Sequence, residues 1–153
     1  MSEGISHVGI DASKMVLAVA VMSEGGLAEF SIPNEAGAIK RMVKKVKRGS
    51  SGSVVFCYEA GATGYVLQRQ VEALGCECLV VAPSLIPVKP GHRIKTDRRD
   101  ARKLAELLRA GLLTAVRPPS EKEESARDLV RCREDVLEDL SRCRHRLVKM
   151  LLR

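Results

Sequence analysis

The sequence predicts an α/β protein in which a mixed sheet with flanking helices is followed by a long C-terminal helix of coiled-coil type. Two observations lead to this prediction. Between residues 53 and 82, two short runs of apolar residues enclose a helical pattern, which is typical of parallel strands joined by a right-handed crossover. After Pro118 and Pro119, residues 120–153 contain neither Gly nor Pro and repeat apolar residues every seven positions.

The front of the chain predicts three strands that form a meander. Residues 7–10, 15–22 and 27–32 are mainly apolar and have strand character. Turn-forming residues separate these strands at 12–14 and 25–26. We therefore expect the sheet to begin with antiparallel pairs.

The next elements alternate between helix and strand. Residues 35–48 carry one apolar stripe at helical spacing, and their other face is basic. The run 53–58 predicts a strand buried on both faces. Residues 61–74 then predict a helix that ends at Gly75, and 78–82 predict another buried strand. This alternation adds parallel strands to the meander and makes the sheet mixed.

The last part of the chain predicts two helices. Residues 83–95 contain three prolines and predict an irregular segment, after which 97–113 predict a helix. In 120–153 an apolar stripe consists of two rows, Leu129, Val136, Cys143 and Met150 in one and Leu140 and Leu147 in the other. Arg133 interrupts the second row. The stripe indicates a helix that pairs with another helix. We expect a homo-oligomer, either a dimer or a tetramer, and the alternative is a hairpin with further sequence of the same chain.

We interpret residues 1–117 as one domain and residues 118–153 as the start of a helical region that mediates self-association. The helical pattern is still in phase at Arg153, where it meets neither a cap nor a breaker. We therefore expect the sequence to be a fragment of a longer protein.

Composition and charge narrow the class of protein. The 153 residues hold 26 Lys and Arg against 19 Asp and Glu, which gives a net charge of +7 and favours an anionic partner. With no Trp, two Tyr and two Phe, the chain lacks the aromatic platform that base stacking needs. No apolar run is long enough to cross a bilayer, so we expect no membrane contact and a cytoplasmic protein.

Five cysteines are scattered over the chain. Their odd number and the size of the chain disfavour a disulfide scaffold. Cys76 and Cys78 could share one face of a strand and bind a metal, but no CxxC motif or pair of His lies near them. We interpret them as small buried hydrophobic residues.

Two acids end two strands of the predicted sheet. Asp11 follows the first strand and Glu59 follows the fourth. In a mixed sheet of this order the two strands are commonly neighbours, which would bring the two carboxylates side by side. Adjacent carboxylates repel each other and need a cation.

A second pair of acids begins the helix at 97–113. Asp97 and Asp100 lie three residues apart, on one face of the first turn. If that turn packs over the strand ends, four carboxylates converge and form a site for Mg²⁺ or Mn²⁺. Two such ions about 4 Å apart can stabilise the attacking and leaving oxygens in phosphodiester cleavage.

Each acid also has a purely structural interpretation. Asp97 could be the N-cap of its helix, with Asp100 at the third helical position. Asp11 could cap the turn before Ser13. Glu59 could be exposed to solvent. The conjunction of four acids at strand ends and a helix start, within a basic chain, favours the catalytic interpretation.

Basic residues are concentrated in two segments. Residues 89–117 hold nine Lys and Arg against three acids, and 40–48 hold six with no acid. Such segments bind nucleic acid through counterion release, although a solvated face has the same composition. The candidates for contact with a phosphate backbone are Lys95, Arg98, Arg99, Arg102 and Lys103.

Three motifs resemble the DEDD-type transposases of bacterial insertion sequences, the family of the Piv DNA invertase and of the bridge-RNA-guided recombinases. They are VGIDASK at 8–14, YEAGATGY at 58–65 and KTDRRDARKLAELLRAG at 95–111. The order and rough spacing of the four acids agree with this family. The resemblance implies an RNase H-like, RuvC-like domain over about residues 5–115, and the start of a coiled-coil region at Ser120.

The resemblance also implies a function. Asp11, Glu59, Asp97 and Asp100 would bind Mg²⁺ or Mn²⁺ in a nuclease-like centre that acts on DNA and is directed by a structured guide RNA. The family has a second domain with a serine that is thought to attack DNA. No serine in this sequence matches that motif, so we expect the isolated chain to lack full recombination activity.

Other functions share some of these features. A RuvC-like structure-specific nuclease would use the same four acids with water alone. A non-catalytic module would bind nucleic acid and dimerise through its long helix. Actin-like and sugar-kinase ATPases also begin with a GID-like strand, but they need a second Gly-rich phosphate loop and a far longer chain.

Overall fold

The computed structural model describes residues 4–61, 63–87 and 96–153. By their contacts, the residues form two compact units, 1–117 and 118–153. The elements of the first unit, in chain order, are β1 (Ser6–Ala12), β2 (Val16–Ser23), β3 (Gly26–Pro33), α1 (Ala36–Gly49), β4 (Val54–Glu59), α2 (Val66–Glu72), β5 (Glu77–Val81), η1 (Pro83–Leu85), α3 (Asp97–Arg109) and β6 (Ala115–Val116). The second unit is α4 (Glu121–Leu151).

Six strands form one mixed sheet in the order β3-β2-β1-β4-β5-β6. The strands β1, β2 and β3 pair as an antiparallel meander, and β4 and β5 extend the sheet parallel to β1. The short β6 closes the other edge antiparallel to β5. This topology confirms the predicted RNase H-like fold, in which an antiparallel meander comes first in the sequence and strands joined by helical crossovers follow.

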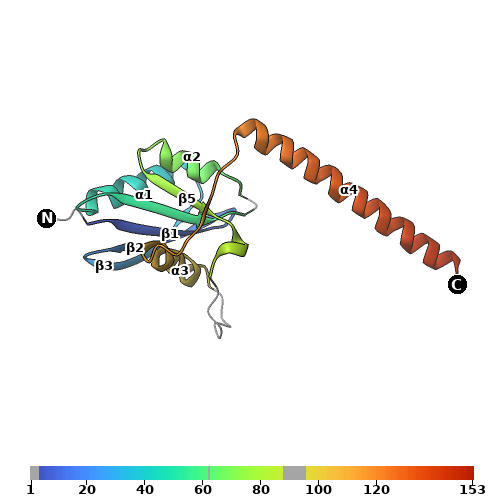
Figure 1. Ribbon diagram of the computed structural model, residues 1–153, viewed down its shortest axis with the longest axis horizontal. Helices are drawn as coiled ribbons and strands as arrows, with labels where there is room; N and C mark the ends of the chain where they lie inside the picture. The colour runs from blue at the N-terminus through green and yellow to red at the C-terminus, as the bar shows by residue number, and fades with distance from the viewer. Residues whose placement is uncertain (1–3, 62, 88–95) are drawn as a thin grey trace. The chain divides into compact units, whose positions relative to one another are not determined.

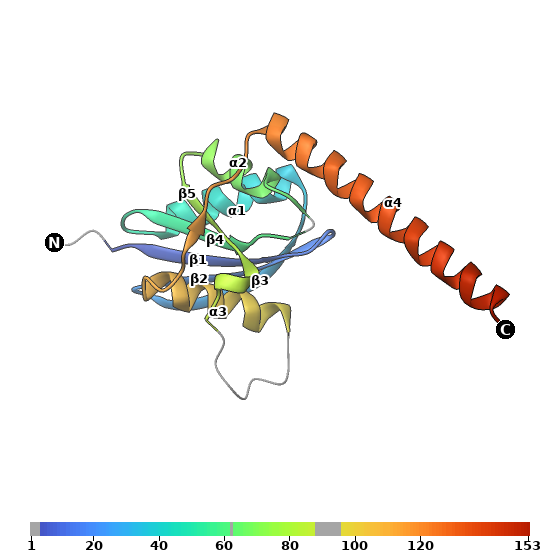
Figure 2. The same ribbon diagram turned by 45° about the vertical axis from the view of Figure 1, so that its right-hand side comes forward.

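Helices cover both faces of this sheet. Figures 1 and 2 show α1 and α2 on one side of the strands and α3 on the other. Packing contacts join α3 to β1 and β2, whereas α2 packs on β5 and also contacts α1. The order of layers is therefore α1 and α2, then the sheet, then α3.

The larger core lies between the sheet and the helices α1 and α2. Alternate residues of the central strands point into it, including Val8 and Ile10 of β1 and Phe56 and Tyr58 of β4. The buried stripe of α1 covers them and consists of Ala38, Ile39, Met42, Val43 and Val46. Cys76 and Cys78 are also buried in this core, which confirms their interpretation as buried residues.

A second, smaller core lies under α3. It consists of Ala18 and Ala20 of β2 and Ala101 and Ala105 of α3, with Met22 packed beside them. Only small residues stand at the centre of this contact, so the backbone of α3 approaches the sheet closely.

Most predicted elements are confirmed, and two boundaries are wrong. The helix predicted over 97–113 ends at Arg109, because Gly111 has a φ of 66° and Leu112 N–H donates to the Leu107 carbonyl, as in a Schellman motif. The helix predicted over 61–74 begins only at Val66. Of the segment predicted as irregular, residues 88–95 lie outside the described residues.

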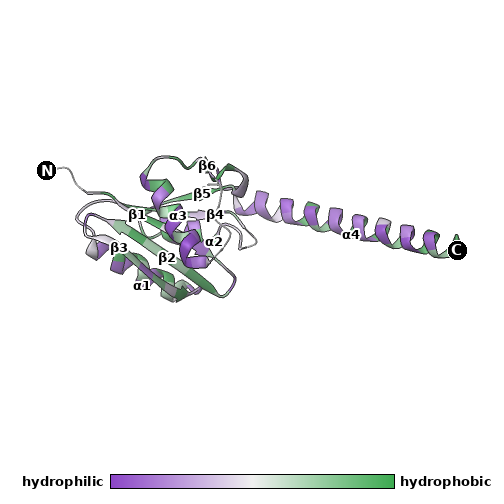
Figure 3. Cartoon of the chain, turned by 90° about the horizontal axis from the view of Figure 1, so that it is seen from below, coloured by the Kyte–Doolittle hydropathy of each residue, from purple (hydrophilic) through white to green (hydrophobic). Residues whose placement is uncertain are grey.

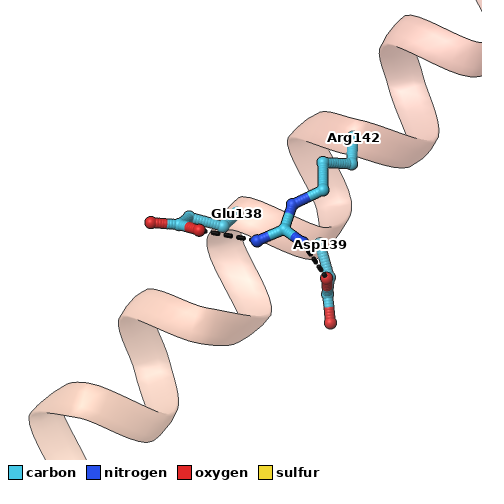
Figure 4. Close-up of polar contacts among 3 residues, drawn as sticks. All are labelled: Glu138, Asp139 and Arg142. Atoms are coloured by element: carbon cyan, nitrogen blue, oxygen red, sulfur yellow. Dashed lines mark hydrogen bonds and ion pairs between the residues drawn. The ribbon is translucent and has the colours of Figure 1, made fainter. Parts of the chain in front are cut away.

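The helix α4 confirms the long C-terminal helix. A capping box begins it: Ser120 Oγ accepts from the Glu123 backbone N–H, and the Glu123 carboxylate accepts from the Ser120 backbone N–H. Figure 3 shows mainly hydrophilic residues along α4, interrupted by hydrophobic ones. Figure 4 shows Arg142 paired with Glu138 at 2.7 Å and with Asp139 at 3.7 Å on the surface of this helix. No helix among the described residues has the length and apolarity needed to span a membrane.

Candidate functional site

Asp11 and Glu59 stand at the carboxyl ends of two adjacent strands. The strands β1 and β4 pair in parallel, with Ile10 opposite Tyr58, and Asp11 and Glu59 are the next residues along each strand. The predicted adjacency of these two strands is therefore confirmed. Both acids are half-buried.

Both acids belong to the face of the sheet that α3 covers. Side chains alternate along a strand, so Asp11 shares the face of Gly9, and Glu59 shares the face of Cys57. A Cβ built on Gly9 would come within 2.5 Å of the Ala105 backbone nitrogen, and Cys57 Sγ lies 3.6 Å from the Leu104 carbonyl oxygen. On the neighbouring strand, Asp11 is opposite Ala18, which packs against α3.

The helix α3 runs antiparallel to β1. Gly9 lies under Ala101 and Ala105 in the middle of the helix. His7 precedes Gly9 in β1, and its pKa is lowered by burial and, second, by the positive charge of Arg109. Arg109 at the end of α3 therefore lies near the start of β1. In Figure 2, the first turn of α3 and the carboxyl end of β1 lie toward the same end of the sheet along the strand direction.

Asp97 and Asp100 continue the sheet-facing stripe of α3 beyond its buried part. The buried residues of this stripe are Ala101, Leu104, Ala105 and Leu107. Asp97 precedes Ala101 by four residues, and Asp100 precedes Leu104 by four, so both acids lie on the same helical face as the buried residues. Asp100 is half-buried and Asp97 is exposed.

The two pairs of acids lie on the same side of the Gly9 contact. Asp11 is two residues beyond Gly9, or about 7 Å along a strand. Asp97 is four residues before Ala101, or about 6 Å along a helix. Because α3 runs antiparallel to β1, both displacements lead toward the carboxyl end of β1.

One of the purely structural interpretations, Asp97 as the N-cap of α3, is wrong, because another residue fills that role. The N-cap of α3 is Thr96, whose Oγ1 accepts from the Arg99 backbone N–H at 3.4 Å. The turn between β1 and β2 is held by Ser13, whose Oγ donates to the Val16 carbonyl at 2.7 Å and accepts from the Val16 N–H at 3.1 Å. Asp97 is the first residue of α3, where its negative charge interacts favourably with the helix dipole.

The acids are arranged as two pairs rather than as one closed cluster. Within the described ranges, no group of three or more His, Cys, Asp or Glu side chains is close enough to hold one metal ion. The donor set nevertheless suits a hard cation, because it consists of carboxylate oxygens alone. The Cys57 thiol is no competing ligand, since burial raises its pKa to about 12.

Four of the five predicted nucleic-acid-binding residues lie on α3. Arg98, Arg99 and Arg102 are exposed, and Lys103 is half-buried. Arg102 Nε donates to Glu106 at 3.0 Å, an exposed pair on one helix that a phosphate can replace at little cost. Lys95 lies outside the described residues.

Two residues that support the site were not predicted from the sequence. Gly9 allows α3 to approach β1, and its only signal was a glycine within an apolar strand. Thr96 caps α3, and its signal was a Thr next to an Asp at a helix start, where either residue could serve as the cap.

The fold and the placement of these acids define the class of this protein: an RNase H-like domain with carboxylates at the carboxyl edge of its central strands. Residues 8–153 match the family model of the DEDD transposases of IS110 elements, which is described as "Transposase". The chain belongs to this transposase family.

Two curated relatives support this assignment. The chain is 49% identical over 152 residues to the proposed transposase y4qE of Sinorhizobium fredii, and the match covers 97% of the chain and 39% of the relative. It is 39% identical over 153 residues to the transposase for insertion sequence element IS1533 of Leptospira borgpetersenii, with 96% and 43% covered. The chain thus spans about two fifths of the length of these relatives.

A solved structure is similar to part of the chain. It is T. thermophilus RuvC in complex with a Holliday junction substrate, with 11% identity and a TM-score of 0.45. The match covers 73% of this chain and 99% of that one.

Proposed function

We propose that this chain is the metal-binding part of a transposase that cleaves and rejoins DNA phosphodiester bonds with Mg²⁺ or Mn²⁺. The observation that carries the proposal is the antiparallel course of α3 over β1. This course directs the turn with Asp97 and Asp100 toward the sheet edge that carries Asp11 and Glu59. Membership of the DEDD transposase family supports the same function.

The four carboxylates would hold the metal between the sheet and the helix. Asp11 and Glu59 are separated only by the spacing of adjacent strands, so their mutual repulsion is relieved when a cation binds. Asp97 and Asp100 would complete an all-oxygen ligand set from the first turn of α3. When bound, Mg²⁺ would polarise the reacting phosphate and offset the charge that develops on its oxygens.

Basic residues of α3 would position the DNA backbone beside these acids. Arg98 and Arg99 are exposed on the first turn of α3, which also carries Asp97 and Asp100. Arg102 and Lys103 follow on the next turn, and Lys95 precedes the helix in the sequence. Such contacts fix a phosphate in place without reading bases.

The attacking group would come from a part of the protein beyond these residues. The curated relatives are more than twice as long as the matched region, which leaves room for a further domain. We propose that a serine of that domain attacks the phosphate, and that a structured guide RNA selects the DNA. We also propose that the chain self-associates through the exposed apolar side chains of α4.

A non-catalytic module that binds nucleic acid and dimerises is the second candidate. The observation in its favour is that the described carboxylates do not form a group of three around one point. In that case the acids of α3 would only stabilise the positive end of the helix dipole. Metal binding distinguishes the two functions.

Iron-directed cleavage of the chain tests the proposed site. Fe²⁺ replaces Mg²⁺ in oxygen-ligand sites, and with ascorbate and peroxide it generates radicals that cut the nearby backbone. We expect cuts near residues 11, 59 and 97–100 in the wild-type chain, suppressed by excess Mg²⁺. Asp11→Asn should remove all three sets together, because they share one metal site.

The control is Glu29→Gln, which replaces an exposed acid of β3 and should leave every cut unchanged. Circular dichroism establishes that both variants are folded. Cuts confined to other residues, or the absence of specific cuts, would contradict the proposal and favour the non-catalytic module.

A further inference from the structure

Every charged residue on the exposed face of α1 is basic. Its six basic residues are Lys40, Arg41, Lys44, Lys45, Lys47 and Arg48, and all are exposed. The helix contains no acidic residue. The nearest acid before it in the sequence is Glu35, at the N-cap. Lys40, Lys44 and Lys47 follow each other one helical turn apart, so this row extends over about 10 Å.

These charges are not neutralised by neighbouring side chains. Among the residues that the structure describes, no ion pair involves a basic residue of α1. Two of the six make other contacts: Lys47 Nζ donates to the Leu74 carbonyl oxygen at 3.2 Å, and Lys45 Nζ lies 5.4 Å from the centre of the Phe30 ring. Both contacts orient a cation while leaving its charge in place.

A hollow lies beside this cationic face. It has a volume of about 310 Å³ and is lined by Val43, Lys44, Lys47, Arg48 and Leu74. Its lining combines the apolar side chains of Val43 and Leu74 with three cations of α1. Three positive side chains around one concave surface attract phosphate more strongly than a flat row of isolated lysines does.

The cationic face is separate from the proposed metal site. The helix α1 covers the face of the sheet opposite α3, as Figures 1 and 2 both show. Asp11 and Glu59 share the α3 face with Gly9 and Cys57. A backbone bound at these acids is therefore not the segment that contacts α1.

We propose that the cationic face of α1 is a second DNA-binding surface, which holds the phosphate backbone of a duplex away from the reacting phosphate. The helix α1 contains no aromatic residue for stacking, so the contact is electrostatic and does not depend on base sequence. The choice of DNA as the partner rests on the proposed function. The surface itself rests on the unneutralised charges and the hollow.

Fluorescence anisotropy tests this surface, with a labelled 20-base-pair DNA duplex, the full 153-residue chain and EDTA to exclude metal effects. The test variant is Lys44→Gln, Lys47→Gln and Arg48→Gln combined. Removing three phosphate contacts should weaken binding about tenfold or more at 100 mM salt and reduce the slope of log K against log salt by about 2 to 3.

The matched control removes the same charge from α4, as Lys122→Gln, Arg131→Gln and Lys149→Gln combined. All three of these residues are exposed. We expect this control to bind several-fold more tightly than the α1 variant, at unchanged helical content of both. Equal losses in the two variants would overturn the proposal, because net charge alone would then explain the binding.

A third variant separates this inference from the proposed function. It combines Arg98→Gln, Arg99→Gln and Arg102→Gln on α3. Weakened binding by the α3 variant with wild-type binding by the α1 variant would overturn the second surface and leave the proposed function intact. No binding of the duplex by the wild-type chain would overturn the second surface, whereas the proposed metal site is tested by iron-directed cleavage. Tighter binding of a duplex RNA would overturn the choice of DNA.

Discussion

Gly9 of β1 lies directly beneath Ala101 of α3. A Cβ at Gly9 would overlap the Ala101 carbonyl oxygen and lie 2.5 Å from the Ala105 backbone nitrogen. Both obstacles are helix backbone and cannot move aside as a side chain does. The distance of α3 from the sheet therefore depends on the absence of a side chain at residue 9. The position of Asp97 and Asp100 depends on the same contact.

Gly9→Ala should destabilise the domain and displace α3. Overpacking a close backbone contact typically costs about 1 to 3 kcal/mol. Urea denaturation followed by circular dichroism measures this cost. Gly49→Ala is the control, because a Cβ there meets nothing within 4 Å, and it should leave stability unchanged or raise it by about 0.5 kcal/mol. Equal stability of Gly9→Ala and wild type would contradict the close approach.

His7 should make stability depend on pH. Burial and, second, the charge of Arg109 lower the pKa of His7 in the folded chain below its ordinary value of 6.5. The unfolded chain therefore binds more protons just below pH 6.5, so stability falls as the pH drops from 7 through this range.

The variant His7→Asn measures this contribution. Urea midpoints at pH 7.0 and 5.5 should differ less in His7→Asn than in the wild-type chain. An identical pH dependence of the two proteins would show that His7 does not contribute. His145→Asn serves as the control, because His145 is exposed on α4.

The five cysteines should divide into two reactive and three protected thiols. Cys132 and Cys143 are exposed on α4, whereas Cys57, Cys76 and Cys78 are buried. Burial also raises the pKa of each of the three buried thiols, so little thiolate is present at neutral pH. Iodoacetamide labelling at low protein concentration, read by peptide mass spectrometry, should modify two thiols quickly and all five only in denaturant.

Self-association through α4 follows from its apolar stripe. Leu129 is 73% exposed and Leu147 is 54% exposed in the single chain. Burying such side chains against a partner helix contributes about 1.5 to 3 kcal/mol each. Leu140→Lys places a charge in this stripe and should weaken association more than tenfold in sedimentation velocity, whereas His145→Lys on the opposite face should not. A wild-type chain that stays monomeric at high concentration would contradict the prediction.

The sequence predicted the fold well where the residue types of a segment and its place in the order of elements indicated the same structure. The strand Val54–Glu59 contains Val, Phe, Cys and Tyr without interruption, and the structure buries it at the centre of the sheet. The expectation that this strand neighbours Ser6–Ala12 followed from the order of elements in the mixed sheet and is confirmed. The capping box at Ser120 likewise begins α4 where a helix was expected.

Features that depend on distant backbone were not predictable. The sequence around Gly9 does not indicate that a helix from residue 97 onward will pack on it. The strand Ala115–Val116 has only two residues and exists because Val116 pairs with Val80. For the four acids, the strands and the helix that carry them could be predicted. Whether the four carboxylates share one cation depends on side-chain positions, which the periodicity of the sequence does not determine.

Calorimetric titration of Mn²⁺ tests most directly whether the acids of the sheet and of α3 form one metal centre. The proteins compared are the wild-type chain, Asp11→Asn from the strand pair, Asp100→Asn from the helix, and Glu29→Gln as the control. We predict one saturable binding event in the wild type and in Glu29→Gln, and its loss in both aspartate variants. Saturable binding of Mn²⁺ that persists in Asp11→Asn and in Asp100→Asn would contradict the shared centre.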